Sequence, residues 1–454
     1  MNIIKKIIEG VPDYNQFMSV AELNESSKQL RDKYPGLVEL LEIGTSKDGE
    51  PIYALKIGSG NKKALLYGFP HPNEPVGSVM LDYLSWKLAE DEEFRNIFDF
   101  TWYIVKVADV EGAKLNEGWF KNPYSFREYV YNYYRPAGNE QVEWAFPIEY
   151  KSLKFDKPIP ETRALMKIIE EAKPDFIYSL HNAGFGGVYY YITEEAHILY
   201  PIYEKAAKDR NVPLSLGEPE IAYAKKLDEA VFIMPTTEDS YDYYEKYSNV
   251  DPANIIMSGE CSFGYARKFN PKLFELVCEV PYYYDERVQD TKETDRSRRE
   301  LVLASLNSNH EDMQTLKGIL EQVKPKISVH TKFQDALEYF IEVSEKSFDA
   351  AVKWAKTAEE LNRNATISEK FDNELVNKSY GLFKWGMLYR MIMVNYEVNK
   401  DPILAKTAEK VKTLIDERIE KLEQQMNFNV IPIRKLVQIQ LTAGLYSALY
   451  MQGR

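Results

Sequence analysis

Short apolar runs alternate with amphipathic stretches along the first 290 or so residues. From Val20 to about Asp290 the apolar runs are rich in β-branched and aromatic residues, and helix-like stretches separate them. This alternation is typical of a parallel or mixed sheet covered by helices. Two such runs flank Asp48-Gly49, a pair that favours a tight hairpin turn. We therefore predict an α/β part with a mixed central sheet and helices on both faces.

The pattern changes to a helical period after about Glu293. Apolar residues recur every three to four positions from Phe333 to Ala355 and again from Leu404 to Met426. Strand signals are nearly absent there. We therefore predict two domains, residues 1–292 with the sheet and residues 293–454 all helical. The helical part could cover a cleft, limit substrate size or form a homo-oligomer.

Two of the predicted buried strands lead directly to a histidine. The run 64–69 is followed by His71 and, three residues later, by Glu74, and the run 175–180 is followed by His181. Ligand sites in open α/β sheets lie at the carboxyl ends of strands, and two histidines with one glutamate are a recurring ligand set of catalytic zinc. Either histidine alone is more often a structural group. Together they predict a site for one zinc ion.

A zinc hydrolase also needs a carboxylate that accepts a proton from water and passes it to the leaving group. The run KLFELVCEVP offers Glu275 and Glu279. In a strand, residues four apart point to the same face, and a glutamate on a buried face is costly unless it is paired or functional. Either residue can be the base, and the other one then pairs with a nearby cation.

Charge and composition exclude several classes of partner. The 57 basic and 70 acidic residues give a formal net charge of −13. Nucleic acids and anionic membranes require an excess of Lys and Arg, so we expect neither partner. Neither a signal peptide nor a membrane span is expected, and Cys261 and Cys278 form no CxxC pair. We therefore expect a cytoplasmic protein without a thiolate zinc site.

Residues 111–160 are rich in Tyr, Asn, Pro and Gly and show little periodicity. A connection of this length is unusual in a compact domain, and long loops often build a site or a lid. We therefore expect an irregular segment close to the zinc site.

From about Tyr14 to Asp285 the chain resembles the zinc carboxypeptidases of the carboxypeptidase A type. The likeness includes the lead-in GTSKDGEPIYALKIG, HPNEPVGS in place of the first zinc motif, SLHNAG around the second histidine, and LVCEVP in place of the stretch with the catalytic glutamate. The resemblance implies a zinc metallopeptidase in which His71, Glu74 and His181 bind the metal and Glu279 is the general acid/base. The helical C-terminal part has no counterpart in the catalytic domain of that family.

The resemblance also implies an arginine that stabilises the oxyanion and a tyrosine that contacts the substrate. Arg135 and Arg127 are both placed to supply the arginine, and the choice between them stays open. Tyr265, in the run SFGYARKF shortly before the strand with Glu279, is a candidate for the tyrosine. For each of these residues an ordinary surface or packing role is the alternative.

One departure from the family concerns recognition of the substrate. Members carry a DxNRNFP-like run whose Asn-Arg pair binds the free C-terminal carboxylate, and the corresponding residues here are Glu143 and Trp144. Either another cation such as Arg267 binds the carboxylate, or Glu143 binds an ammonium group, or Glu143 pairs with a local arginine. Gln141 replaces the aspartate that orients a zinc-binding histidine and can still accept a hydrogen bond.

These features favour a zinc-dependent peptidase that resembles a carboxypeptidase but recognises the C-terminus differently. An amidohydrolase acting on small N-acyl amino acids or amides is the enzymatic alternative, because the same zinc site would serve it. A non-catalytic peptide-binding relative is the alternative from another class. The expected partner is in each case a peptide or a small amide.

Overall fold

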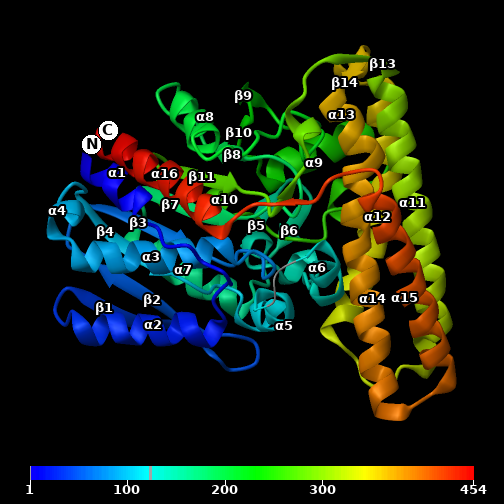
Figure 1. The fold of residues 1–454 in the computed structure, drawn as a ribbon, viewed down its shortest axis with the longest axis horizontal. Coiled ribbons are helices and arrows are strands. Elements are labelled where there is room, and N and C mark those ends of the chain that lie inside the picture. The colour runs from blue at the N-terminus through cyan, green and yellow to red at the C-terminus, as the bar shows by residue number, and fades with distance from the viewer. Residues whose placement is uncertain (1, 122–124) are drawn as a thin grey trace.

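The computed structural model describes residues 2–121 and 125–454, and its centre is a mixed sheet (Figure 1). Within the described residues, nine strands form this sheet. In spatial order they are β1 (Val38–Thr45), β2 (Pro51–Ile57), β4 (Phe100–Val105), β3 (Lys62–Tyr67), β7 (Phe176–His181), β11 (Phe274–Glu279), β8 (Tyr189–Ile192), β10 (Val231–Ile233) and β9 (Lys226–Asp228). Strands β4, β3, β7 and β11 are mutually parallel, whereas β2 and β8 flank them in antiparallel pairing. The predicted mixed α/β sheet is confirmed.

The predicted hairpin forms the edge of this sheet. Strands β1 and β2 pair in antiparallel register from Val38 opposite Ile57 to Thr45 opposite Pro51. Gly49 in the connecting turn has a φ of 86°, which a residue with a side chain rarely adopts. Gly49 therefore permits the tight turn that joins β1 to β2 in this register.

Helices of the first part surround the sheet. They are α1 (Asn2–Glu9), α2 (Val20–Lys33), α3 (Val76–Glu90), α4 (Glu92–Arg95), α5 (Val110–Phe120), α6 (Phe126–Asn132), α7 (Pro160–Ala172), α8 (Tyr200–Lys208), α9 (Thr237–Tyr247) and α10 (Ser262–Ala266). Residues 111–160 are more regular than their composition suggests, because they contain most of α5, all of α6 and the short strands β5 (Ile148–Tyr150) and β6 (Leu153–Phe155). The buried rings of Trp119 and Tyr129, 4.5 Å apart, pack α5 against α6. Residues 122–124 of this segment lie outside the described part.

The helical part stands beside the sheet in Figure 1. Its helices are α11 (Arg298–Val323), α12 (Lys332–Thr357), α13 (Ile367–Phe371), α14 (Asn377–Asn399) and α15 (Pro402–Glu423), and a π-helical turn, Asp372–Val376, leads into α14. Phe383 of α14 stacks on Tyr133 with ring centroids 4.5 Å apart, and one hydrophobic core cluster continues from the sheet into these helices. Within the described residues, no helix is both long and apolar enough to cross a membrane.

The last helix, α16 (Ile433–Gln452), returns to the sheet and lies beside α1 and α3 (Figure 1). A Cβ atom on Gly444 would lie 2.6 Å from the ring of Tyr178, so glycine permits α16 to approach β7 closely. The division at residue 292 remains a prediction, and the structure adds that the chain re-enters the first part after α15.

Side-chain alternation along β7 decides which residues face the site. Gly77 of α3 lies against Leu180, and Gly444 of α16 lies against Tyr178, so these helices cover one face. Successive side chains in a strand point to opposite faces. Ser179 and His181 therefore face the other side, where α7 and α10 lie.

Candidate active site

Three neighbouring parallel strands bring the predicted site residues together. His181 is the last residue of β7, and Glu279, the last residue of β11, is its register partner. His71 and Glu74 lie in the turn that connects β3 to α3. The amide of Val76 at the start of α3 donates to Asn182 Oδ1 at 3.1 Å, which ties this turn to the residue after His181.

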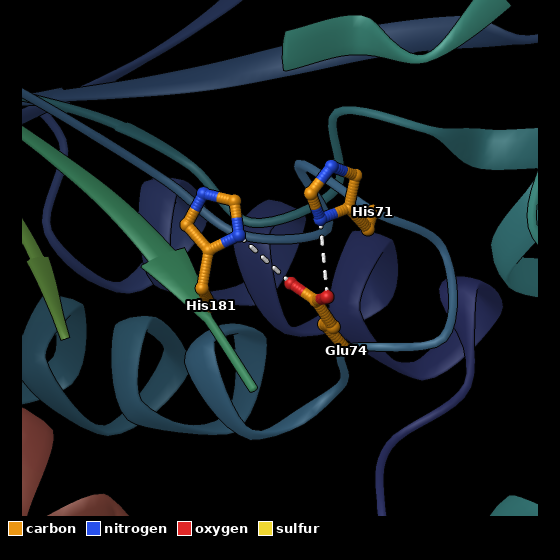
Figure 2. Close-up of side chains that lie close together, drawn as sticks. All are labelled: His71, Glu74 and His181. Atoms are coloured by element: carbon orange, nitrogen blue, oxygen red, sulfur yellow. Dashed lines mark hydrogen bonds and ion pairs between the residues drawn. The ribbon is translucent and has the colours of Figure 1, made fainter. Parts of the chain in front are cut away.

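Both histidines direct their Nδ1 atoms at the carboxylate of Glu74 (Figure 2). His71 Nδ1 lies 3.0 Å from Glu74 Oε1, and His181 Nδ1 lies 3.0 Å from Glu74 Oε2. One potential ligand atom from each residue lies within 4.8 Å of the other two, and all three side chains are buried. The structure therefore brings together the three ligands that the sequence predicts.

Unpaired polar atoms test whether this group suits zinc. His181 Nδ1 and Glu74 Oε2 are buried and, within the described part of the chain, have no hydrogen-bond partner beyond their 3.0 Å contact with each other. Glu279 Oε2 is buried there and has no partner. Buried polar atoms normally have a partner, because leaving them unpaired costs free energy. Two nitrogens and one carboxylate aimed at a common point match the His₂Glu set of catalytic zinc sites. These residues fit the ion.

Charge interactions separate the pKa values of the three residues. Burial and the adjacent Arg135 lower the pKa of His71 to about 3. Burial raises the pKa of Glu74, but the two histidines outweigh it and lower the pKa overall. Burial lowers the pKa of His181, whereas Glu74 and Glu279 raise it to about 9 without a metal. Glu74 is thus an anionic carboxylate between two imidazoles, and a cation bound here would displace a proton from His181.

Glu279 and Arg135 line the same cavity as His71 and Glu74, two of the three candidate metal ligands. Glu279 Oε1 is 3.8 Å from His181 Nδ1, and Arg135 Nη1 is 3.8 Å from Glu74 Oε1. Burial, with Glu74 nearby, raises the pKa of Glu279 well above its usual value. A raised pKa suits a carboxyl group that must both accept and return a proton. Gln141 Oε1 accepts a hydrogen bond of 3.4 Å from Arg135 Nε, so Gln141 positions this arginine.

The other residues proposed from sequence lie outside the cavity. Arg127 forms an ion pair with Asp416 of α15, and Arg267 forms one of 2.7 Å with Glu238. Tyr265 is buried, and its hydroxyl donates to Glu170 of α7 at 2.6 Å. Trp144 is partly buried and is not part of the cavity wall. Among the described arginines considered for the oxyanion, Arg135 is the one that reaches the site.

Glu143 does not occupy the position that its place in the sequence suggested. Its side chain is 5% exposed and lies beneath the site, where it accepts hydrogen bonds from the hydroxyls of Tyr67, Ser179 and Ser262. No arginine pairs with it among the described residues, so the local-arginine alternative is wrong. A buried carboxylate surrounded by hydroxyls does not reach a substrate ammonium group either, because it does not line the cavity.

The helical part forms one wall of the cavity beside the candidate metal ligands. The volume of this cavity is about 520 Å³, and His71, Glu74, Arg135 and Glu279 line its floor. Wall residues come from α11, α12 and α14 and include Leu306, Trp354, Tyr380 and Phe383. The helical period alone does not indicate that these residues line the cavity beside the candidate metal ligands.

Tyr380 of α14 holds the loop that follows His181. Its hydroxyl accepts hydrogen bonds from the amides of Gly184 at 3.0 Å and Phe185 at 3.1 Å, and it donates one of 3.0 Å to the carbonyl of Phe185. Tyr380 is separated from His181 by about two hundred positions in the chain, and no motif surrounds it. Sequence reasoning therefore missed it.

Comparisons with known proteins agree with the family resemblance of the motifs. The family model of the zinc carboxypeptidases, Peptidase_M14, matches residues 23–246. This match confirms the resemblance of residues 23–246 to the zinc carboxypeptidases. The match ends before Glu279, whose place follows from the register of β11 beside β7.

Individual relatives are distant. Zinc carboxypeptidase A 1 of Anopheles gambiae is 25% identical over 154 residues, which are 32% of this chain and 35% of that protein. The chain thus spans about a third of the length of this curated relative. Carboxypeptidase A from Helicoverpa armigera has 14% identity, covers 79% of this chain and 81% of its own, and gives a TM-score of 0.40. Bovine thrombin-activatable fibrinolysis inhibitor, in complex with tick carboxypeptidase inhibitor, has 11% identity, covers 76% and 97%, and gives 0.38.

Proposed function

We propose that this protein is a zinc-dependent hydrolase that cleaves a peptide bond or another amide bond. One observation carries the proposal: His71, Glu74 and His181 converge beside Glu279, and His71, Glu74 and Glu279 line one cavity. The match of residues 23–246 to the family model of the zinc carboxypeptidases supports it.

His71 Nδ1, His181 Nδ1 and a carboxylate oxygen of Glu74 would hold one zinc ion. When bound, zinc acts as a Lewis acid and lowers the pKa of water toward neutrality. Glu279 then takes the proton of the attacking water and returns it to the departing nitrogen, a role that its raised pKa and its position beside His181 favour. Arg135, held by Gln141, stabilises the negative charge that develops on the carbonyl oxygen.

Recognition of the substrate differs from that implied by the family motif. Glu143 is buried in its hydroxyl network and Trp144 carries no charge, so the carboxylate clamp is missing at these positions. Arg127 and Arg267 are paired elsewhere. Arg135 is the cation of the described cavity wall, and it serves the oxyanion. We therefore propose a peptidase that does not require a free C-terminal carboxylate.

The limited volume of the cavity favours a second candidate, an amidohydrolase acting on small N-acyl amino acids or amides. Helices α11, α12 and α14 wall the cavity, and about 520 Å³ accommodates a substrate of a few residues at most. A peptide-binding relative without activity is disfavoured, because the candidate ligands and the candidate base are all in place.

Incubation of a substrate mixture with zinc-loaded protein and with a chelated control tests the proposal. The mixture holds peptides with free and with amidated C-termini, with L- and D-residues, together with N-acyl amino acids, and mass spectrometry follows the products. Zinc-dependent cleavage that is indifferent to amidation supports a peptidase without a carboxylate clamp. Cleavage of the N-acyl amino acids alone would favour the amidohydrolase over the peptidase.

Two results would contradict the recognition or the activity. Loss of single residues only from free C-termini would show that a carboxylate is recognised after all. Absence of cleavage in all substrates, with zinc bound, would favour the binding protein. Glu279→Gln is the matched control, because it preserves side-chain size and removes the proton acceptor.

A further inference from the structure

Ser179 lies directly behind the zinc-facing edge of His181. Both residues belong to β7, two positions apart, so they share one face of the strand. Ser179 Oγ is 2.8 Å from His181 Nε2 and 3.0 Å from Glu143 Oε2. The side chain of Ser179 is fully buried, so water does not replace either contact.

The Glu143 carboxylate determines the direction of the two hydrogen bonds that join His181, Ser179 and Glu143. A carboxylate accepts and does not donate, so Ser179 donates its single proton to Glu143. The Ser179 oxygen then accepts from His181, which places a proton on Nε2. The lone pair of His181 is thereby on Nδ1, the atom 3.0 Å from Glu74 Oε2 that has no hydrogen bond among the described residues. These two hydrogen bonds therefore select the His181 tautomer whose Nδ1 can bind a metal.

Glu143 is itself held from three directions. Tyr67 donates to its Oε2, and Ser262 contacts its Oε1 through both the hydroxyl at 2.8 Å and the amide at 3.2 Å. Ser262 Oγ also lies 2.6 Å from Oε1 of Glu275. Burial, followed by the charge of Glu143, raises the pKa of Glu275 well above its usual value. A protonated Glu275 can donate to Ser262, which leaves the Ser262 proton for Glu143.

His71 receives no comparable support. Its Nε2 is buried and has no hydrogen bond within the described residues. Gln141, which stands where the family motif has the orienting aspartate, directs its oxygen to Arg135 and its nitrogen to the carbonyl of Pro136 at 2.9 Å. The carboxylate that supports a metal ligand therefore serves the second histidine and not the first.

We propose that Glu143, acting through Ser179, is a positioning residue that orients His181 for zinc. Glu143 stands at the position that the family motif assigns to substrate recognition, and here it serves metal binding instead. Outer hydrogen-bond partners of ligating histidines fix the tautomer and the ring orientation, and their loss typically lowers metal affinity ~10- to 100-fold. The inference rests on the zinc site of the proposed function but not on the reaction.

The test is the zinc dissociation constant, measured on the full chain by competition with a chromophoric chelator. Ser179→Ala removes the bridge, and Glu143→Gln places an amide group, which must donate on one side, against the hydroxyl donors. We expect each variant to bind zinc ~10- to 100-fold more weakly than the unchanged protein. Ser447→Ala is the matched control, because Ser447 is a buried serine of α16 that is hydrogen bonded to Tyr203. It should bind zinc as the unchanged protein does.

A second readout separates positioning from general destabilisation. In the zinc-loaded protein the Nε2 proton of His181 should give a protected, downfield proton resonance, and Ser179→Ala should shift or lose it. Unchanged zinc affinity in Ser179→Ala or in Glu143→Gln would overturn the inference, as would equal weakening in Ser447→Ala. If Ser179→Ala does not fold, Glu143→Gln decides the question. Zinc affinity is measured without substrate. The inference about Glu143 can therefore fail while the proposed hydrolase activity stands, and the hydrolase activity can fail while the inference stands.

Discussion

Replacing Tyr380 with phenylalanine tests whether the helical part shapes the active site. Tyr380→Phe keeps the ring, which packs edge-on against Phe383 with centroids 5.8 Å apart, and removes only the hydroxyl. Three hydrogen bonds to the loop after His181 are lost, two from the amides of Gly184 and Phe185 and one to the Phe185 carbonyl. The variant therefore isolates the polar link between α14 and the loop.

The expected cost follows from those three bonds. Each net hydrogen bond contributes about 1 kcal/mol, so the free energy of unfolding should fall by about 3 kcal/mol. Unfolding entropy is about 2.1 cal/mol/K per residue, or close to 1 kcal/mol/K for a chain of this length that unfolds as one unit. The melting temperature should therefore fall by about 3 °C. Because the loop follows His181, a candidate metal ligand, we also expect kcat/KM to fall by about tenfold, equivalent to about 1.4 kcal/mol.

The assay combines thermal unfolding of the zinc-loaded protein with hydrolysis of the best substrate found above. Tyr389→Phe is the matched control, since Tyr389 lies on the same helix and packs edge-on against Tyr131 with centroids 5.4 Å apart. An unchanged melting temperature together with unchanged kcat/KM in Tyr380→Phe would refute the reasoning. It would mean that α14 covers the site without ordering it.

Three further predictions concern the proton acceptor, the arginines and a buried carboxyl group. Glu279→Gln should lower kcat by about 10²- to 10⁴-fold while zinc content, measured by mass spectrometry of the metal, stays at that of the unchanged protein; retained turnover would remove Glu279 from the mechanism. Arg135→Ala should lower kcat by about 10²- to 10³-fold, whereas Arg127→Ala should leave it within about twofold; equal effects would contradict the assignment. Burial raises the pKa of Asp109, the N-cap of α5, to about 7 in the folded state. The folded form then holds this proton more tightly than the unfolded chain, so its contribution to stability is complete below about pH 4 and is lost as the pH rises to 7, by at most about 4 kcal/mol. Asp109→Asn keeps the cap and should remove that part of the pH dependence of chemical denaturation; an identical pH dependence in both proteins would refute it.

The sequence was sufficient where neighbouring residues carry the information. Period-two and period-3.6 patterns predicted the sheet and the helical part, because side-chain direction repeats locally along a strand or a helix. His71 and Glu74 are three positions apart, and the strand before His181 ends at that residue. The same local logic could have indicated Ser179, which shares the face of His181 two positions earlier.

Tertiary structure decided the features that depend on distant parts of the chain. Arg135 and Arg127 are equivalent as residue types, and only packing places the first beside Glu74 and pairs the second with Asp416. Glu143 changed from an expected substrate contact to a buried partner of Ser179, because strands and loops far apart in sequence surround it with hydroxyls.

The helices that wall the cavity, α11, α12 and α14, depend most clearly on tertiary structure for their role. An amphipathic period states that one face of a helix is buried, but it does not state against which surface. The approach of α14 to the loop after His181 joins residues about two hundred positions apart, through the hydroxyl of Tyr380. The sequence by itself predicted the candidate metal ligands and the class of fold. Which arginine reaches these residues, what holds His181 and what walls the cavity were decided by long-range packing, which no local pattern encodes.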